Sequence, residues 1–269
     1  MTFSLAQNIM PMSLISVLLP TRNSGAYLRL AIDSILNQSF VDFELLMIDD
    51  GSTDSSVYEL EGIGDERLRI VRSAESRGIA YRLNEGVELA RGKYIARMDG
   101  DDISLPDRLA CQVKFLEENP EVDLCATAYQ VIDANGTKGK VFLTPPDHEA
   151  ICCRLWLGIP MGHPTWMGRA EWFKGNRYKY PAPYCCEDQE LLLRSYKQSR
   201  FAALPEVHLL YRRINPQPMG KLFKTRIALF REQVRYFSTN RRYHFAALSL
   251  LACCARIFRD LMARSRFSI

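Results

Sequence analysis

The sequence predicts an α/β protein in which a mainly parallel sheet is flanked by helices. Between residues 14 and 131, short apolar runs that indicate buried strands alternate with segments of helical apolar spacing. Polar residues directly follow three of these runs, and ligands of open α/β sheets bind beyond the carboxyl ends of the strands. The chain of 269 residues, 47% hydrophobic and 25% charged, is long and apolar enough to bury such a core.

The first strand is predicted over residues 14–19, after a loose leader at residues 1–12. We expect Pro20 to end this strand, and Thr21 and Asn23 to lie in the polar loop that follows. This loop has no glycine-rich dinucleotide fingerprint, and the chain has no P-loop motif. The sequence therefore argues against a dinucleotide-dependent dehydrogenase and against a P-loop enzyme.

A helix is predicted over residues 27–36 and a second buried strand over residues 43–48. This strand runs into Asp49 and Asp50, which open a turn whose polar residues can also cap a helix. A third strand is predicted over residues 68–71. The second strand therefore also delivers polar side chains at its carboxyl end.

The fourth strand, predicted over residues 94–98 after a helix over 78–90, leads directly into Asp99, Asp101 and Asp102. Neighbouring carboxylates repel one another, and a bound divalent cation removes that penalty. Oxygen ligands suit Mg²⁺ or Mn²⁺, which is often held by one or two carboxylates and the phosphates of a substrate. The pattern indicates a metal–diphosphate site.

The alternative is an acidic surface turn that caps the next helix, and Asp102 in particular could either bind metal or cap a helix beginning near Pro106. The chain continues with a helix over residues 109–116 and a strand over 124–131. Further predicted elements are a helix over 147–157, a helix with Glu187 and Asp188 in its first turn, and a strand over 205–212.

The net charge of +4 is too small to indicate nucleic-acid binding. The eight cysteines do not have the spacing of zinc or thioredoxin motifs, so we expect a reduced, cytoplasmic chain. The N-terminus has no charged side chain before Arg22 and is a poor signal peptide. Its apolar run is too short for a membrane helix.

Positive charge is concentrated at the C-terminal end. From Arg212 onward there are thirteen Arg or Lys residues and two acids, Glu232 and Asp260. Apolar residues recur at helical spacing between these cations, which predicts a basic amphipathic helical tail. Such a tail suits the surface of an anionic membrane. The alternative is that its helices cover the preceding domain and keep their arginines in solvent.

Several segments resemble family-2 glycosyltransferases, over roughly residues 14–215 and in that family's order. They are L-I-S-V-L-L-P-T-R-N from Leu14, F-E-L-L-M-I-D-D-G-S-T-D from Phe43, R-G-I-A-Y-R-L-N-E-G from Arg77, A-R-G-K-Y-I-A-R-M-D-G-D-D-I-S-L-P-D-R-L from Ala90, H-P-T-W-M-G-R from His163 and E-D-Q-E-L-L-L-R from Glu187. The resemblance implies a GT-A fold, a nucleotide-diphosphate-sugar donor and inversion at the anomeric carbon.

The resemblance also implies roles on the donor side. The loop of Pro20, Thr21 and Asn23 would cradle the nucleotide, and Asp49 or Asp50 would read the base. Asp99 would contact the ribose and, with Asp101, hold a Mn or Mg ion. Arg77, Arg82 and Arg97 are each candidates to meet the diphosphate, or to be ordinary helix or strand residues.

On the acceptor side, Asp188 would be the general base and Glu187 its support. His163 would either contact the acceptor or be a structural histidine. The expected division is a catalytic domain over residues 1–215, with a nucleotide-binding half near 14–135 and an acceptor half near 136–215, and a basic tail over 216–269.

The expected function is an inverting, metal-assisted hexosyl transfer from a UDP-sugar to a glycan or lipid-linked acceptor. The expected location is the cytoplasm, peripheral to the inner face of the plasma membrane. One alternative is a sugar nucleotidyltransferase, although the loop after the first strand lacks the glycine-rich, basic sequence of such enzymes. The other is an inactive GT-A-like binding or scaffold protein, which the intact Asp99, Asp101 and Asp188 argue against.

Overall fold

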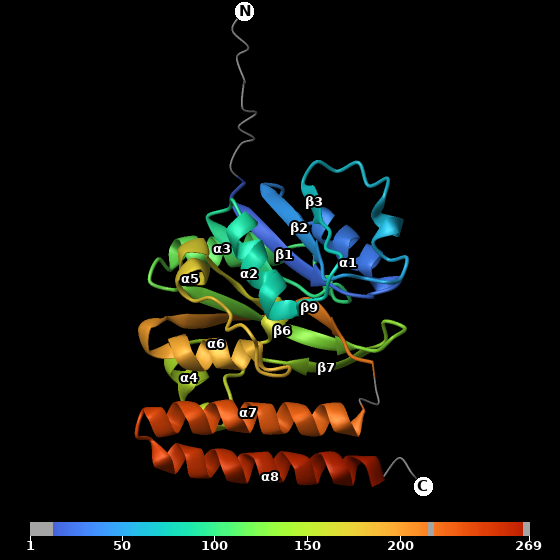
Figure 1. Cartoon of the computed structure of the whole chain (residues 1–269). Coiled ribbons are helices and arrows are strands. Elements are labelled where there is room, and N and C mark those ends of the chain that lie inside the picture. The colour runs from blue at the N-terminus through green and yellow to red at the C-terminus, as the bar shows by residue number, and fades with distance from the viewer. Residues whose placement is uncertain (1–12, 215–217, 266–269) are drawn as a thin grey trace, which may run out of the picture.

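In the residues that the computed structural model describes, 13–214 and 218–265, nine strands form one curled sheet with helices on both faces (Figure 1). The predicted leader at residues 1–12 and the predicted boundary at 215/216 lie outside these residues. The strand order is β3-β2-β1-β4-β8-β6-β9-β5, and β7 pairs with β6. The strands are β1 (Ile15–Thr21), β2 (Phe43–Asp49), β3 (Leu68–Val71), β4 (Tyr94–Arg97), β5 (Ile103–Ser104), β6 (Leu124–Ile132), β7 (Lys138–Phe142), β8 (Met167–Arg169) and β9 (Phe201–Arg212).

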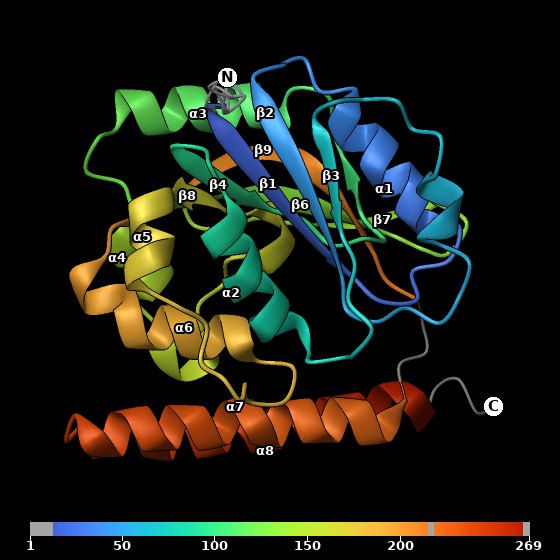
Figure 2. The same cartoon turned by 45° about the horizontal axis from the view of Figure 1, so that its top comes forward.

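The N-terminal half of the sheet is parallel, as the sequence predicts. β1 pairs with β2 on one side and with β4 on the other, and β3 extends the sheet beyond β2. Every residue of β1, β2 and β4 is buried because helices cover both faces. All three strands therefore end at one edge of the sheet, where their polar loops meet (Figure 2).

The first strand does not stop at Pro20, as the sequence suggested, but continues to Thr21. Leu18 O accepts a hydrogen bond from Met98 N, the residue directly after β4. Pro20 is two residues further along and faces the same neighbouring strand, so its nitrogen lies beyond the last residue of β4. The missing N–H of Pro20 therefore removes no hydrogen bond from the sheet.

The second half of the sheet is mixed. β8 runs antiparallel to β4 and β6, whereas β6 and β9 are parallel along most of their length. The sequence did not predict β5, β7 or β8. β5 and β8 are only two and three residues long, and β7 is almost fully exposed, so none has a clear apolar pattern.

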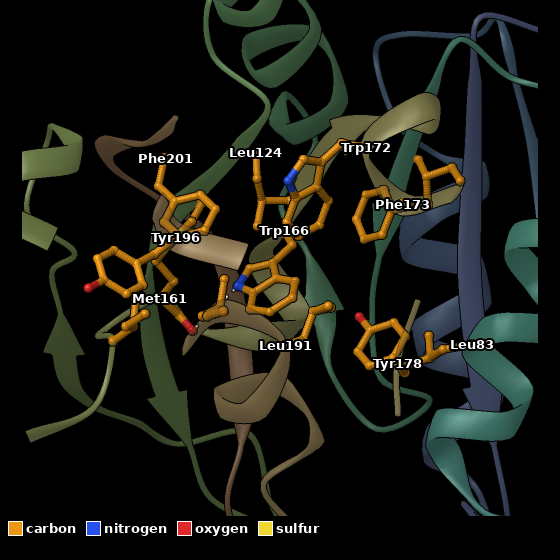
Figure 3. Packing of buried hydrophobic residues seen from close by; sticks show 14 of the residues in the cluster. Leu83, Leu124, Met161, Trp166, Trp172, Phe173, Tyr178, Leu191, Tyr196 and Phe201 are labelled. Atoms are coloured by element: carbon orange, nitrogen blue, oxygen red, sulfur yellow. Dashed lines mark hydrogen bonds between the residues drawn. The ribbon is translucent and has the colours of Figure 1, made fainter. Parts of the chain in front are cut away.

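Two buried clusters lie on opposite faces of the sheet. α2, α5 and α6 cover one face, and α1 and α3 cover the other. Figure 3 shows the first cluster, in which Trp166, Trp172, Phe173 and Leu191 pack together. Leu191 is fully buried and fixes α6 against the sheet. The helices of this domain are α1 (Tyr27–Leu36), α2 (Ile79–Leu89), α3 (Arg108–Glu118), α4 (His148–Cys152), α5 (Ala170–Gly175) and α6 (Glu187–Ser195).

The helix predicted over residues 147–157 is only partly correct. α4 ends at Cys152, and a separate 3₁₀ turn spans Leu155–Leu157. Asp147 caps α4, because its Oδ1 accepts a hydrogen bond from Ala150 N at 2.8 Å.

The C-terminal segment forms a hairpin of two long helices, α7 (Met219–Thr239) and α8 (Tyr243–Ser265), as Figure 1 shows. α7 packs on α6: Phe237 is fully buried, and Gln233 donates a hydrogen bond of 2.9 Å to Leu155 O. α8 lies against α7 as the outer layer of the molecule. Over the described residues, none of the helices is both long and apolar enough to span a bilayer.

Candidate functional site

The carboxylates after β4 form one cluster. In the part of the chain described, one oxygen from each of Asp99, Asp101 and Asp102 lies within 4.8 Å of the others. Asp99 is also held by Arg97, whose guanidinium contacts its two oxygens at 2.5 and 2.8 Å. Arg97 is almost fully buried, so it fixes Asp99 from inside the sheet.

The crowding of three carboxyl groups disfavours ionisation of Asp101 and Asp102. Burial, and then the charge of Asp99, raises the pKa of Asp101 to about 6. Burial and the charges of Asp99 and Asp101 raise the pKa of Asp102 well above its ordinary value. One oxygen of Asp102 accepts from Arg212 N at 2.8 Å, and the other is buried without a hydrogen-bond partner among the described residues.

Asp102 does not cap α3, contrary to one of the two sequence-based alternatives. The residue at the cap position is Asp107, and its side chain makes no capping hydrogen bond. Asp102 instead joins the turn after β4 to the last residue of β9. This role could not be read from spacing, because Arg212 is 110 residues away in the chain.

A hard divalent cation fits this cluster. Three convergent carboxylates supply the oxygen ligands that Mg²⁺ and Mn²⁺ prefer, and the buried unpaired oxygen of Asp102 has no other partner. A cation would also relieve the repulsion that raises the two carboxyl pKa values. Asp101 and Asp99 are the residues that border open space here, because both line the two hollows described next.

A smaller hollow of about 320 Å³ lies at the carboxyl ends of β1, β2 and β4. Its lining includes Pro20, Thr21, Asp50, Asp99 and Asp101. Thr21 Oγ1 would lie 2.8 Å from a Cβ added to Gly100, so a side chain at this position would displace the loop after β1. Gly100 therefore lets this loop close on the acidic turn.

Asp50 is fully engaged by the protein. Its Oδ1 accepts from Arg77 N and Arg82 Nε, and its Oδ2 from Ser76 Oγ and Gly78 N, at 2.7–3.0 Å. Burial opposes ionisation, but these hydrogen bonds outweigh it and hold the pKa of Asp50 below its ordinary value. Asp50 thus anchors the chain that leads into α2.

Three other residues that the sequence predicts to lie on the side of the nucleotide-sugar donor are found near Asp50, each in a different environment. Asp49 is buried, and its Oδ1 accepts one hydrogen bond, of 2.9 Å, from Ser52 N. Asn23 links the two loops, because it donates from its main chain to Ser52 Oγ and accepts from Thr53 N. The guanidinium of Arg77 stacks on Tyr81 at 3.9 Å. None of Asn23, Asp49 and Arg77 lines either hollow.

A larger hollow of about 920 Å³ adjoins the first, since Asp99 and Asp101 line both. Glu187 and Asp188, from the first turn of α6, face it together with His163 and Arg97. The tertiary structure therefore brings the acids after β4 and the acids of α6 to one space. The sequence predicted both groups, but it gave no evidence that they meet.

Charge and burial set the protonation of the α6 acids. Burial, followed by the charge of Asp188, raises the pKa of Glu187 to about 7. Burial also raises the pKa of Asp188, against the hydrogen bonds of Gln189 and the charge of Arg97. An aspartate with a raised pKa is a stronger base than an ordinary one, which suits the role of a general base.

His163 is a buried, neutral histidine that faces the same hollow. Its Nε2 lies 2.7 Å from the phenol oxygen of Tyr178, and its Nδ1 lies 3.8 Å from Glu187 Oε1. Burial and the neighbouring Arg97 charge hold its pKa well below the ordinary value. The structure shows a partnered structural histidine that also lines the larger hollow, and contact of His163 with an acceptor stays a prediction.

The sequence gave no signal for several residues that line the larger hollow. Lys221 and Arg226 enter it from α7, and Tyr211 from β9. The sequence named Arg97 only as one of three arginines that could meet the diphosphate. Its position between the two acid groups is seen only in the structure. A long-range contact of this kind leaves no mark on local spacing.

Comparisons with known proteins agree with this geometry. The profile named "Glycosyl transferase family 2" matches residues 16–176. An uncharacterized glycosyltransferase of Haemophilus influenzae is 29% identical over 210 residues, which is 74% of this chain and 65% of that protein. The chain thus spans about two thirds of the length of this curated relative.

Two solved structures share the fold. Staphylococcus aureus TarS, crystallised with UDP-GlcNAc, has a TM-score of 0.64 at 19% identity, over 82% of this chain and 66% of TarS. The mannosyltransferase PcManGT of Pyrobaculum calidifontis, in complex with GDP-Man and Mn²⁺, has a TM-score of 0.61 at 18% identity, over 93% of this chain and 76% of PcManGT. At these identities the likeness concerns the fold, which agrees with the predicted α/β class.

Proposed function

Because the chain belongs to glycosyl transferase family 2, we propose that it transfers a sugar from a nucleotide-diphosphate donor to an acceptor hydroxyl. The observation that carries this proposal is the meeting of two acid groups at one space. Asp99 and Asp101 border both hollows, and Asp188 faces the larger one. A donor in the smaller hollow would therefore point its sugar toward Asp188.

The donor in this proposal is a UDP-sugar, whose nucleotide lies against Pro20 and Thr21. TarS, which shares the fold, was crystallised with UDP-GlcNAc, and this supports uridine as the base. Asp50 lines the smaller hollow and Asp49 lies beside it, but the base is read by Asp49, because the oxygens of Asp50 are already occupied by four protein donors. Asp49 has a single hydrogen bond by comparison.

Asp101 and Asp99 would hold the divalent cation, Mn²⁺ or Mg²⁺, with Asp102 behind them. When bound, such an ion supplies Lewis acidity that stabilises the charge of a leaving diphosphate. The mannosyltransferase PcManGT, with its Mn²⁺ complex, supports the choice of metal. Arg97 would keep Asp99 oriented through its two-contact ion pair.

Asp188 acts as the general base. It takes the proton of the acceptor hydroxyl, and the oxygen attacks the anomeric carbon as the bond to the diphosphate breaks. Attack comes from the face opposite the leaving group, so a single displacement inverts the configuration. Glu187 holds the preceding position and, with a pKa of about 7, limits the negative charge beside the base near neutral pH.

The acceptor is a glycan or lipid-linked glycan at the cytoplasmic face of a membrane. α8 presents a stripe of outward apolar side chains, each between 48% and 65% exposed: Tyr243, Leu250, Leu251, Phe258, Leu261 and Met262. Their spacing places them on one side of the helix. The two acids of the hairpin are paired, Glu232 with Lys179 and Asp260 with Arg226, whereas Arg235 and Arg241 are exposed.

The exposed apolar stripe of α8, on a hairpin whose exposed cations include Arg235 and Arg241, is complementary to an anionic bilayer surface. α8 is therefore proposed as a helix that lies in the membrane interface. α7 instead covers the preceding domain, which was the alternative for the tail helices in the sequence analysis. It packs on the catalytic domain and lines the larger hollow.

The experiment that tests the proposed function is hydrolysis and transfer across a panel of nucleotide sugars, with Mn²⁺ and with EDTA. Metal-dependent release of UDP from one UDP-sugar is the expected result. Formation of a nucleotide sugar from a sugar phosphate and a nucleoside triphosphate would assign a nucleotidyltransferase instead. Donor binding without any turnover, with every acceptor class tried, would assign a binding protein.

A further inference from the structure

The wall of the larger hollow that α7 forms carries positive charge. Lys221, Leu222, Thr225 and Arg226 all line the hollow, and their spacing places them along one side of the first turns of α7. Arg213, just after β9, also lines the hollow, as do Arg97 and Arg212 on the side of the β4 acids. The acids Asp99, Asp101, Glu187 and Asp188 lie elsewhere in the same lining, so the hollow contains both an acidic group and a basic group.

The positive charge at Arg226 is not balanced by its neighbours. Asp260 is shared by two guanidinium groups, Arg226 at 3.1 Å and Arg259 at 3.8 Å. Arg256 donates a hydrogen bond to Leu157 O, and burial and then the charges of Arg226 and Arg259 lower its pKa. Three guanidinium groups therefore surround one carboxylate, and a further anion would find favourable electrostatics here.

This basic wall is next to the α6 acids. Cys185, which precedes Glu187 by two residues, lines the hollow together with Thr225. The charge of Lys221 also acts on the Cys185 thiol. The smaller hollow, where the donor is proposed to lie, includes none of these α7 residues. An anion on the α7 wall would therefore belong to the acceptor.

The lining also includes well-exposed apolar side chains. Leu143 is 69% exposed and Ile214 is 51% exposed, and both line the hollow together with Leu222. Exposed apolar groups beside clustered cations favour a ligand that carries a negative group next to an apolar chain.

We propose that Lys221 and Arg226, supported by Arg213, form a subsite for a phosphate or diphosphate group carried by the acceptor. This inference rests on the proposed function, and it names the acceptor's chemical class. The hydroxyl-bearing sugar would lie at Asp188, the phosphate on the α7 wall and any apolar chain at Leu143 and Ile214. Guanidinium and ammonium groups bind phosphate oxygens through charge-assisted hydrogen bonds.

The test uses the full chain in EDTA, where metal-dependent donor binding is absent. The ligands are farnesyl diphosphate, farnesol and inorganic pyrophosphate, and affinity is measured by calorimetry. We expect farnesyl diphosphate to bind at least about tenfold more tightly than farnesol. Lys221→Ala and Arg226→Gln should each weaken it by about tenfold or more, as for a lost charged hydrogen bond.

The matched controls are Lys224→Ala and Arg231→Gln, which remove exposed cations of α7 that lie outside the lining. These variants should bind as the parent does. Arg226→Gln also removes an ion pair with Asp260, so melting curves must show that it is folded. Lys221→Ala provides the independent variant if it is not.

Unchanged affinity in Lys221→Ala, or equal binding of farnesol and farnesyl diphosphate, would overturn the subsite. If pyrophosphate binds as tightly as farnesyl diphosphate, the phosphate alone is recognised and a soluble phosphorylated glycan suffices. Tighter binding of farnesyl diphosphate assigns a lipid-linked source. The assay involves no sugar transfer, so a failed donor panel would refute the proposed function without affecting this result.

Discussion

The guanidinium of Arg97 and the carboxylate of Asp99 form a two-contact ion pair, at 2.5 and 2.8 Å, at the carboxyl end of β4. Burial works against the charge of Arg97, but Asp99, Tyr178 and Glu187 together keep its pKa raised. Arg97 is therefore the positive charge between the acids of the β4 turn and those of α6. Since Arg97 already neutralises Asp99, Asp101 is the lining carboxylate that depends most on a metal.

Asp101→Asn should abolish metal-dependent donor binding and turnover while the fold remains. The variant removes a charge that the cluster repels, so its melting temperature in EDTA should equal or exceed that of the parent. Calorimetric titration with UDP and Mn²⁺ measures the binding. Asp107→Asn is the control, because this exposed carboxylate makes no cap hydrogen bond. Undiminished Mn²⁺-dependent turnover in Asp101→Asn would refute the metal role.

Asp188→Asn should lower turnover by about 10²–10⁴ with little change in donor affinity, because asparagine cannot accept the proton. Single-turnover kinetics and UDP-sugar titration separate these two quantities. Glu190→Gln is the matched control in the same turn, since Glu190 pairs with Arg194 and does not line the larger hollow. A fall in donor affinity with an unchanged rate per bound donor would make Asp188 a binding residue.

Asp49→Asn and Asp50→Asn should have different effects. Asp50→Asn places an amide opposite four donors and breaks a buried ion pair with Arg82, so unfolding free energy should fall on the order of 3 kcal/mol. Asp49→Asn should retain most of the stability and weaken UDP binding specifically. Chemical denaturation and UDP titration measure the two effects. Equal loss of stability in both variants would contradict the assignment of Asp49 as the base reader.

Stability in EDTA should fall as the pH rises from about 5 to about 8. The folded-state pKa of Glu187 is about 7 and its ordinary value is 4.5, so the folded chain binds more protons in this interval. The favourable contribution is complete below 4.5 and is lost as the pH passes through 7. Glu187→Gln should reduce the slope of the melting-temperature profile, with Asp101, whose pKa is raised to about 6, contributing to the slope that remains, whereas Glu190→Gln should leave the profile unchanged. A parent profile that rises with pH would contradict the shift.

Leu251→Glu combined with Phe258→Glu should remove binding to anionic liposomes without unfolding the protein, because both side chains are 65% exposed on α8. Cutting the chain after Tyr236 would be a poorer test, since it deletes the buried Phe237. Sedimentation with liposomes at low and high salt measures binding, and Val41→Glu, at an exposed apolar site outside the hairpin and outside both hollows, is the control. If the parent protein forms a dimer, and the double variant loses the dimer but still binds liposomes, the stripe is a contact surface for a second copy of this chain.

Local pattern predicted the parallel half of the fold closely. The helix at 27–36 and the strand at 68–71 have the predicted bounds, because both carry apolar residues at regular spacing between turn residues. Short or exposed strands were missed. β7 has almost no buried side chain and is held by main-chain pairing with β6, which leaves no trace in composition.

The sequence by itself determined which chemical groups exist: the three acids after β4, the Glu187–Asp188 pair and the basic amphipathic hairpin. Each is a run of neighbouring residues, and a strand end or helix start fixes where such a run points. Only the tertiary structure decided which groups share a space. In the folded chain Arg97 is buried between the two acid groups, and Asp50 accepts hydrogen bonds from four protein donors. Lys221 and Arg226 line the larger hollow. These contacts join segments far apart in the chain, and packing of the whole sheet and its helices sets their distances.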